Sequence, residues 1–126
     1  MKIIKTTGAP AAIGPYSQAV KEKNFVFLSG QLGIDPESRE LSGESTAEQA
    51  EQALMNIAKV LKAAGTGMDK VVKTTVFLKN IKDFSDFNEV YKNFFSEPFP
   101  ARSCVQVAAL PMDAKVEIEV IAGYGK

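Results

Sequence analysis

Apolar side chains between Ser45 and Gly65 recur every three to four residues, which is the spacing of one face of an α-helix. Ser45 is followed three residues later by Glu48, the capping-box pattern of a helix start, and Gly65 supplies a stop. The sequence therefore predicts a helix here that lies on a sheet. Its apolar positions are Ala50, Ala53, Leu54, Ile57, Ala58, Leu61 and Ala64.

Four short segments are rich in β-branched or aromatic residues, or alternate in polarity, and each predicts a strand. They are residues 25–29, 71–78, 103–110 and 115–123. Aromatic side chains between Phe84 and Phe95 repeat at helical spacing and predict a second helix that ends before Pro98. Residues 8–17 and 35–43 are rich in turn-forming or polar residues and are predicted loops.

The order of strands, helix, strand, helix and two strands indicates an α+β fold, with two helices packed on one face of a mixed sheet. The chain has 126 residues, which fits one domain over residues 1–126. Pro111, Met112 and Asp113 turn the chain between the last two strands, which we expect to be neighbours in a hairpin.

Charge and cysteine content narrow the possible partners. Fifteen basic residues balance fifteen acidic ones, which argues against a nucleic-acid partner held mainly by counterion release. The single cysteine, Cys104, excludes an internal disulfide and favours a reducing compartment, so we expect a cytosolic protein. No apolar run approaches the ~20 residues of a membrane helix, and we expect no membrane partner.

The chain has no histidine, which excludes a Ser-His-Asp triad and imidazole ligands for a metal. One cysteine cannot form a thiolate cluster, and there is no phosphate-binding glycine loop with its lysine. The sequence therefore predicts neither a metal site nor a cofactor.

Arginine occurs only at positions 39 and 102. Arg39 lies in a polar stretch and is interpreted as a solvated surface residue. Arg102 opens an apolar strand after a rigid proline segment, and a guanidinium in such surroundings requires a partner. That partner is either an internal Asp or Glu in a structural salt bridge, or the carboxylate of a ligand held by two parallel hydrogen bonds.

Glu117 and Glu119 alternate with Val116, Ile118 and Val120 and therefore project from the opposite face of their strand. They form either an ordinary solvated face or one wall of a cleft. In the second case a carboxylate beside Arg102 could orient or deprotonate a water molecule. That arrangement needs the two strands to be adjacent and in suitable register.

Three other positions have two interpretations each. Tyr16, on a Pro/Gly loop, either faces a ligand or caps the core. Ser29 and Gly30 end a strand where the backbone could approach a ligand, although the glycine could also serve a bulge or turn. Cys104 is interpreted mainly as a small buried hydrophobic residue, and the aromatic face of the second helix as core.

Together, several segments resemble the RidA (YjgF/UK114) family over nearly the whole chain. A lone Pro-Ala-Arg would mean little, but the ordered combination is specific. The segments are residues 11–18 (AAIGPYSQ), 29–31 (SGQ), 72–77 (VKTTVF), 100–107 (PARSCVQV), 110–111 (LP) and 116–119 (VEIE).

The resemblance implies a chorismate-mutase-like fold and a homotrimer whose active clefts lie between subunits. Arg102 then matches the arginine that binds the substrate carboxylate, and Glu117 matches the acid that positions the attacking water. Cleft-lining positions are matched by Tyr16, Ser29, Gly30, the backbone of Cys104 and, with a weaker match, Asn88.

The implied activity is hydrolysis of small 2-imino or enamine acids, 2-iminobutanoate and 2-iminopropanoate, to 2-keto acids and ammonia without a cofactor. Two alternatives stay open. One is an RNA-directed protein, either an endoribonuclease or a translation inhibitor. The other is a ligand-sensing or chaperone-like trimer that binds a carboxylate without turnover.

Overall fold

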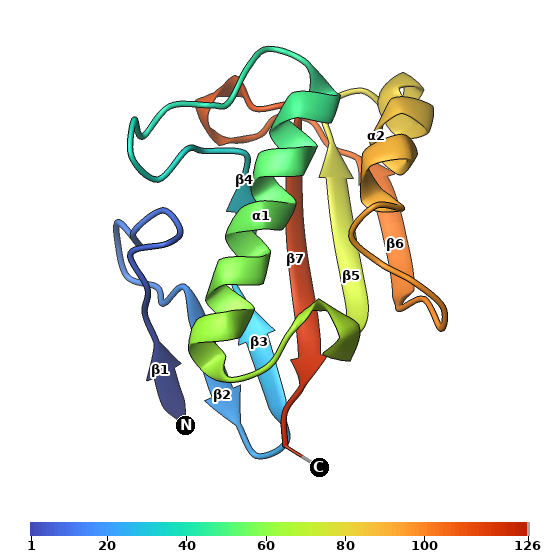
Figure 1. The fold of residues 1–126 in the computed structure, drawn as a ribbon. Helices are drawn as coiled ribbons and strands as arrows, with labels where there is room; N and C mark the ends of the chain where they lie inside the picture. The colour runs from blue at the N-terminus through green and yellow to red at the C-terminus, as the bar shows by residue number, and fades with distance from the viewer. Residues whose placement is uncertain (126) are drawn as a thin grey trace.

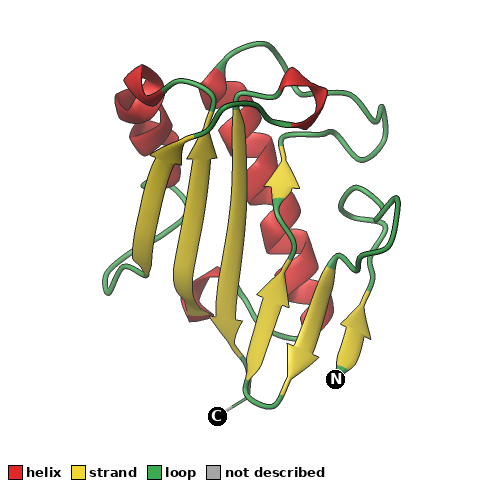
Figure 2. Cartoon of the chain, turned by 180° about the vertical axis from the view of Figure 1, so that it is seen from behind, coloured by secondary structure: helices red, strands yellow, loops and turns green. Residues whose placement is uncertain are grey.

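A mixed sheet carries two helices on one of its faces, as Figures 1 and 2 show from opposite sides. The structure is a computed structural model, and it describes residues 1–125. The strand order is β1-β2-β3-β7-β5-β6, and β4 also pairs with β7. This arrangement confirms the predicted α+β class. The strands are β1 (Lys2–Ile4), β2 (Ala19–Glu22), β3 (Phe25–Leu28), β4 (Gln31–Leu32), β5 (Val71–Leu78), β6 (Ala101–Gln106) and β7 (Val116–Gly123).

The long helix α1 (Thr46–Ala64) has the boundaries that its capping signals indicate. The Ser45 hydroxyl accepts a hydrogen bond from the Glu48 amide, and the Glu48 side chain accepts one from the Ser45 amide. Gly65 follows with a φ of 85°, a left-handed conformation that favours glycine. Local sequence therefore specifies both ends of this helix.

The second helix, α2 (Phe84–Tyr91), ends earlier than predicted. The chain continues in a turn in which the amide of Asn93 donates to the carbonyl of Val90. Phe95 nevertheless stays buried, with its ring centroid 4.6 Å from that of Tyr91. The prediction was too long because aromatic burial continues through the turn after the helical hydrogen bonds have stopped.

The expected hairpin of the last two strands is wrong. Strand β6 pairs in parallel with β5, and β7 pairs antiparallel with the other side of β5. The connection through α2 returns the chain parallel to β5, as helical crossovers do. Residues 107–115 then carry the chain past β5 to the start of β7, so β6 ends at Gln106 and not at residue 110.

The core lies between the sheet and the helices. Val76, Ile118 and Val120 point from the sheet toward α1, whose Leu54 and Ile57 are completely buried. Each such side chain contributes about 1.5–3 kcal/mol of burial.

The other face of the sheet has no helix over it (Figure 2). Three apolar side chains on this face are 41–46% exposed: Phe25, Phe27 and Val105. Exposed apolar side chains on one face of a sheet are typical of surfaces that contact another chain.

A bulge interrupts the sheet between β3 and β4. Phe27 pairs with Ile121 and Gln31 pairs with Ile118. The segment from β3 to β4 therefore advances four residues while its partner β7 advances three. The extra residue lies within the segment that contains Ser29 and Gly30, which agrees with the bulge interpretation of this glycine. In the part of the chain that the structure describes, no helix is long and apolar enough to cross a membrane.

Candidate active site

The guanidinium of Arg102 lies against α2. Arg102 pairs with Thr74 of β5, and its side chain is on the helix-covered side of the sheet. Its Nη1 donates a hydrogen bond of 2.8 Å to Oδ1 of Asn88. Its Cζ lies 4.7 Å from the ring centroid of Tyr91 and 5.3 Å from that of Phe84. Two aromatic rings and one amide oxygen therefore surround the charge.

No carboxylate among residues 1–125 forms an ion pair with Arg102. The interpretation of Arg102 as one half of an internal salt bridge is therefore wrong for the described chain. Asn88 accepts from only one of the several N–H groups of the guanidinium. The group is half-buried, so its charge and its other donors can serve a ligand.

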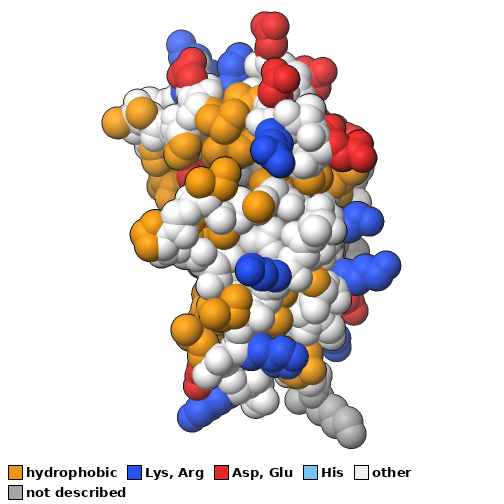
Figure 3. Space-filling view, turned by 90° about the vertical axis from the view of Figure 1, so that its left-hand side faces the viewer, with side chains coloured by type: hydrophobic (Ala, Val, Ile, Leu, Met, Phe, Trp, Pro, Cys, Tyr) orange, Lys and Arg blue, Asp and Glu red, His pale blue; other side chains and the backbone are white. Residues whose placement is uncertain are grey.

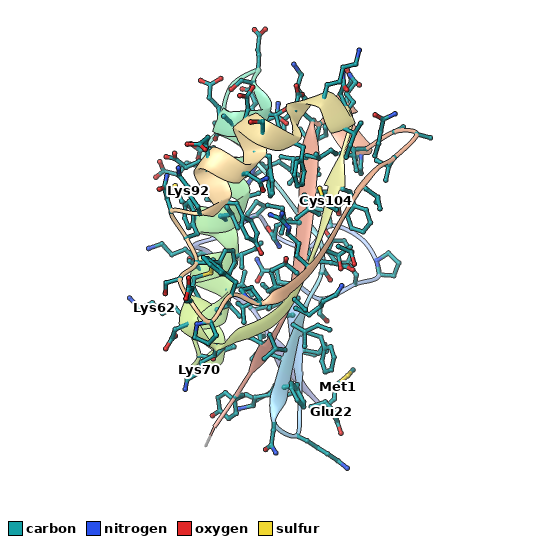
Figure 4. The ribbon with its side chains drawn as sticks, turned by 90° about the vertical axis from the view of Figure 1, so that its right-hand side faces the viewer. Met1, Glu22, Lys62, Lys70, Lys92 and Cys104 are labelled. Carbon is teal, nitrogen blue, oxygen red and sulfur yellow. The ribbon has the colours of Figure 1, made fainter. Side chains whose placement is uncertain are left out.

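Cys104, labelled in Figure 4, lies two residues further along β6, and the alternation of side chains along a strand places it on the same side as Arg102. The thiol is half-buried and packs against the core, in agreement with its interpretation as a small hydrophobic residue. Burial raises the pKa of the Cys104 thiol, and the Arg102 charge opposes that rise. The sulfur is therefore a neutral thiol near pH 7 and not a nucleophilic thiolate.

A second set of predicted site residues lines a cavity of about 1030 Å³ elsewhere in the chain. The Tyr16 side chain is 53% exposed and does not cap the core. The Ser29 hydroxyl donates a hydrogen bond of 2.6 Å to the carbonyl of Ser17, which ties the two segments together. The predicted residues that line this cavity are Tyr16, Ser29, Gly30 and Glu117, and Arg39, exposed as expected, lies at the same cavity.

Glu117 is the half-buried acid of this cavity. Burial raises the pKa of its carboxyl group, and the neighbouring charge of Glu119 raises it further. Both acids lie on the side of β7 that faces away from the helices. A carboxylate with a raised pKa is a better proton acceptor than an ordinary surface glutamate, so Glu117 is suited to act on a water molecule.

Arg102 and Glu117 do not meet within the chain. Thr74 of β5 pairs with Arg102 on one side and with Val120 on the other, three residues from Glu117. Two strand spacings and three residues separate the Cα atoms by roughly 14 Å. The two side chains also project from opposite faces of the sheet, and their surroundings form two separate candidate half-sites.

Several residues of the half-sites were not recognised in the sequence. Asn88 was predicted through the family resemblance, but Phe84 and Tyr91 were not. The three residues have the i, i+4, i+7 spacing of one helix face, and this spacing was a signal that could have joined Phe84 and Tyr91 to Asn88. Met112 lines the cavity only because the connection after β6 crosses the sheet. No local pattern indicated that position.

Gln18 shapes the N-terminal wall of the cavity. It is 3% exposed, and its Nε2 donates hydrogen bonds of 3.0 and 2.7 Å to the carbonyls of Thr6 and Pro10. Its Oε1 accepts a hydrogen bond of 2.7 Å from the Thr6 amide. One buried side chain thus holds a loop that has no regular backbone pairing of its own.

Basic side chains do not form a patch on the face of the molecule that Figure 3 shows. Figure 3 faces the side of the molecule on which the N-terminal segment lies, and there hydrophobic side chains group together while Lys and Arg side chains are spread singly. Within residues 1–125, no three His, Cys, Asp or Glu side chains are grouped so that they could hold a metal ion.

The mixed sheet with two helices on one of its faces defines the fold class of this protein. The family model described as Endoribonuclease L-PSP matches residues 6–124. The chain belongs to this family, the RidA family.

Similar proteins match almost the whole chain. A protein of Bos taurus named 2-iminobutanoate/2-iminopropanoate deaminase is 56% identical over 98% of this chain and 90% of its own length. The crystal structure of RidA from the Antarctic bacterium Psychrobacter sp. PAMC 21119 is 51% identical, with a TM-score of 0.94 over 98% of this chain and 99% of that one. The structure of E. coli TdcF with bound serine is 45% identical, with a TM-score of 0.94 over 99% and 100%.

Proposed function

We propose that this chain is a 2-iminobutanoate/2-iminopropanoate deaminase, an enzyme that hydrolyses small 2-imino acids to 2-keto acids and ammonia. The observation that carries the proposal is the Arg102 guanidinium, which has an amide and two rings around it but no carboxylate among residues 1–125. The Bos taurus relative bears this activity in its name. The bound serine of TdcF has a carboxylate and a 2-nitrogen, as a 2-imino acid does.

In this mechanism Arg102 holds the substrate carboxylate through two parallel hydrogen bonds. Glu117 takes a proton from a water molecule while the oxygen adds to the imine carbon, and this proton passes to the imine nitrogen to give a carbinolamine. The carbinolamine hydroxyl then loses its proton to Glu117, the amino nitrogen takes up that proton, and ammonia leaves as the C–N bond breaks and the C=O bond forms. Positioning and one acid-base group supply about 10²–10⁴-fold, which suits an imine that also hydrolyses spontaneously.

The two half-sites require a second copy of the chain. Arg102 lies on the edge strand β6, and Glu117 lies at a cavity beyond β5. A contact that joins unlike surfaces closes into a ring when its rotation permits. We propose the homotrimer that the family resemblance implies, with the uncovered sheet face and its exposed Phe25, Phe27 and Val105 turned toward the other copies.

A coupled assay tests the activity. Threonine dehydratase generates the imino acid, and 2-oxobutanoate formation is followed with and without this protein. Arg102→Ala is expected to lose about a hundredfold or more in kcat/KM, and Arg102→Lys to recover little because a lysine cannot form the paired hydrogen bonds. Lys62→Ala, an exposed change at the end of α1, is the control. Near-normal activity of a folded Arg102→Ala protein would reject the proposal.

Mixed oligomers test the division of the site between copies. Arg102→Ala and Glu117→Gln chains are each expected to be inactive alone. In an equal mixture that has been unfolded and refolded together, about a quarter of the sites would combine an intact arginine with an intact glutamate from different chains. No recovery, in a mixture shown to contain both chains in one oligomer, would place the whole site within one protomer.

Two other functions are distinguished by the same variants. The family description names an endoribonuclease, and RNA binding that weakens steeply with salt and survives Arg102→Ala would favour that function. Saturable binding of 2-oxobutanoate without catalysis of imine hydrolysis would favour a sensing role. The cytosolic location and the absence of a cofactor stay predictions.

A further inference from the structure

The surroundings of Arg102 come from one face of α2. Phe84, Asn88 and Tyr91 are spaced by four and three residues, so their side chains lie in a row along the helix. All three contact the guanidinium. We call these three side chains the α2 cradle.

Tyr91 is the most firmly held member of the α2 cradle. It is 6% exposed, and its hydroxyl forms a hydrogen bond of 2.9 Å with Oγ1 of the buried Thr74. Its ring centroid lies 5.4 Å from that of Phe87 and 4.6 Å from that of Phe95. The ring therefore offers Arg102 a fixed surface, and the guanidinium gains cation–π stabilisation there.

Every member of the α2 cradle is electrically neutral. An aspartate at position 88 would have almost the same shape as the asparagine, but it would pair with the guanidinium as a charge and neutralise it. Asn88 instead gives Arg102 a single acceptor at 2.8 Å and leaves its positive charge uncompensated. A salt bridge would both orient the guanidinium and neutralise its charge, whereas Asn88 orients it without neutralising it.

We propose that the α2 cradle fixes the orientation of the Arg102 guanidinium and, because it is neutral, reserves the charge for the substrate carboxylate. Phe84, Asn88 and Tyr91 are then positioning residues that set substrate affinity through Arg102. The proposal rests on the proposed function, in which Arg102 binds that carboxylate.

Asn88→Asp is the decisive variant. It adds the competing carboxylate at a half-buried position with little change in shape. KM for the imino acid is expected to rise about tenfold or more, with a smaller change in kcat, because the aspartate competes with the substrate for the same donors. Asn93→Asp makes the same chemical change just after α2, where the side chain donates to the Glu89 carbonyl, and should leave KM unchanged.

Tyr91 provides a second, independent variant pair. Tyr91→Leu removes the ring and is expected to raise KM by about three- to thirtyfold. Tyr91→Phe keeps the ring and loses only the hydrogen bond to Thr74, so it should restore most of the affinity. A merely structural role of Tyr91 would lower the stability of both variants without this difference in KM.

Calorimetric binding of 2-oxobutanoate, which has the carboxylate but no imine, measures the same effect without turnover. Weaker binding in Asn88→Asp than in Asn93→Asp supports the cradle. If Arg102→Ala is inactive while Asn88→Asp and Tyr91→Leu keep the wild-type KM and affinity, the cradle is rejected and the proposed function stands. If Arg102→Ala is fully active, the proposed function itself fails.

Discussion

The carboxylate of Glu117 occupies the space in which a side chain at position 30 would begin. A Cβ atom built on Gly30 would lie 2.8 Å from Cδ of Glu117 and closer still to its Oε2. Gly30 belongs to the bulged segment between β3 and β4, and Glu117 to the strand beside it. The Glu117 carboxylate can therefore hold its position only because Gly30 has no side chain.

Gly30→Ala is expected to displace the Glu117 carboxylate and lower kcat/KM by about tenfold to a hundredfold, because a shift of about 1 Å in a reacting group has effects of this size. The fold should survive, since the group that moves is the flexible end of a side chain. Steady-state kinetics and thermal unfolding measure the two effects.

Gly123→Ala is the matched control for this change. A Cβ there lies 3.7 Å from its nearest neighbour, the carbonyl of Lys70, which is an ordinary contact. If Gly30→Ala has the kinetics of this control, Gly30 does not position the acid.

The acidic limb of the pH profile should report Glu117. Its pKa is raised by burial first and by the charge of Glu119 second. A base must be ionised, so kcat/KM is expected to fall as the pH drops through the raised pKa. Glu119→Gln removes the second cause and should move this limb to lower pH, whereas Glu51→Gln, the same change on the exposed side of α1, should not. An unmoved limb in Glu119→Gln would contradict the coupling.

The free energy of unfolding should also depend on pH through Glu117, in a direction that its raised pKa determines. A raised carboxyl pKa means that folding favours the protonated form, so this stabilisation is present below the ordinary value of 4.5 and is lost as the pH rises through the raised pKa. Glu117→Gln is therefore expected to be more stable than the wild type at neutral pH, with a difference that shrinks in acid. Denaturant unfolding of both proteins at neutral pH and at acidic pH measures this difference in stability.

Gln18→Glu is expected to loosen the N-terminal wall of the cavity. The ionised glutamate cannot donate to the carbonyls of Thr6 and Pro10, so the variant should lose about 1–3 kcal/mol in unfolding free energy as well as activity. Gln106→Glu is the control, because this exposed side chain only accepts a hydrogen bond, from the Ile81 amide, and a glutamate still accepts. Equal stability of the two variants would show that Gln18 does not hold the loop.

Local sequence was sufficient for the elements whose ends are specified by neighbouring residues. The α1 helix and strand β5 have the predicted extents, because a capping box, a terminal glycine and a run of β-branched residues act over a few positions. The short strands β1 and β2 were not predicted. A strand of three or four residues carries little pattern, and pairing with its neighbours decides its conformation.

The sequence by itself determined the fold class, the family resemblance and the identity of Arg102 and Glu117 as unusual charged residues. Only the tertiary structure decided that β5 separates their strands, that they face opposite sides of the sheet and that Arg102 rests on neutral groups of α2. Residue types and spacing act locally, whereas the order of strands and the partners of a charge depend on contacts between segments far apart in the chain. The placement of Arg102 and Glu117 on two faces of one sheet is therefore visible only once the chain is folded.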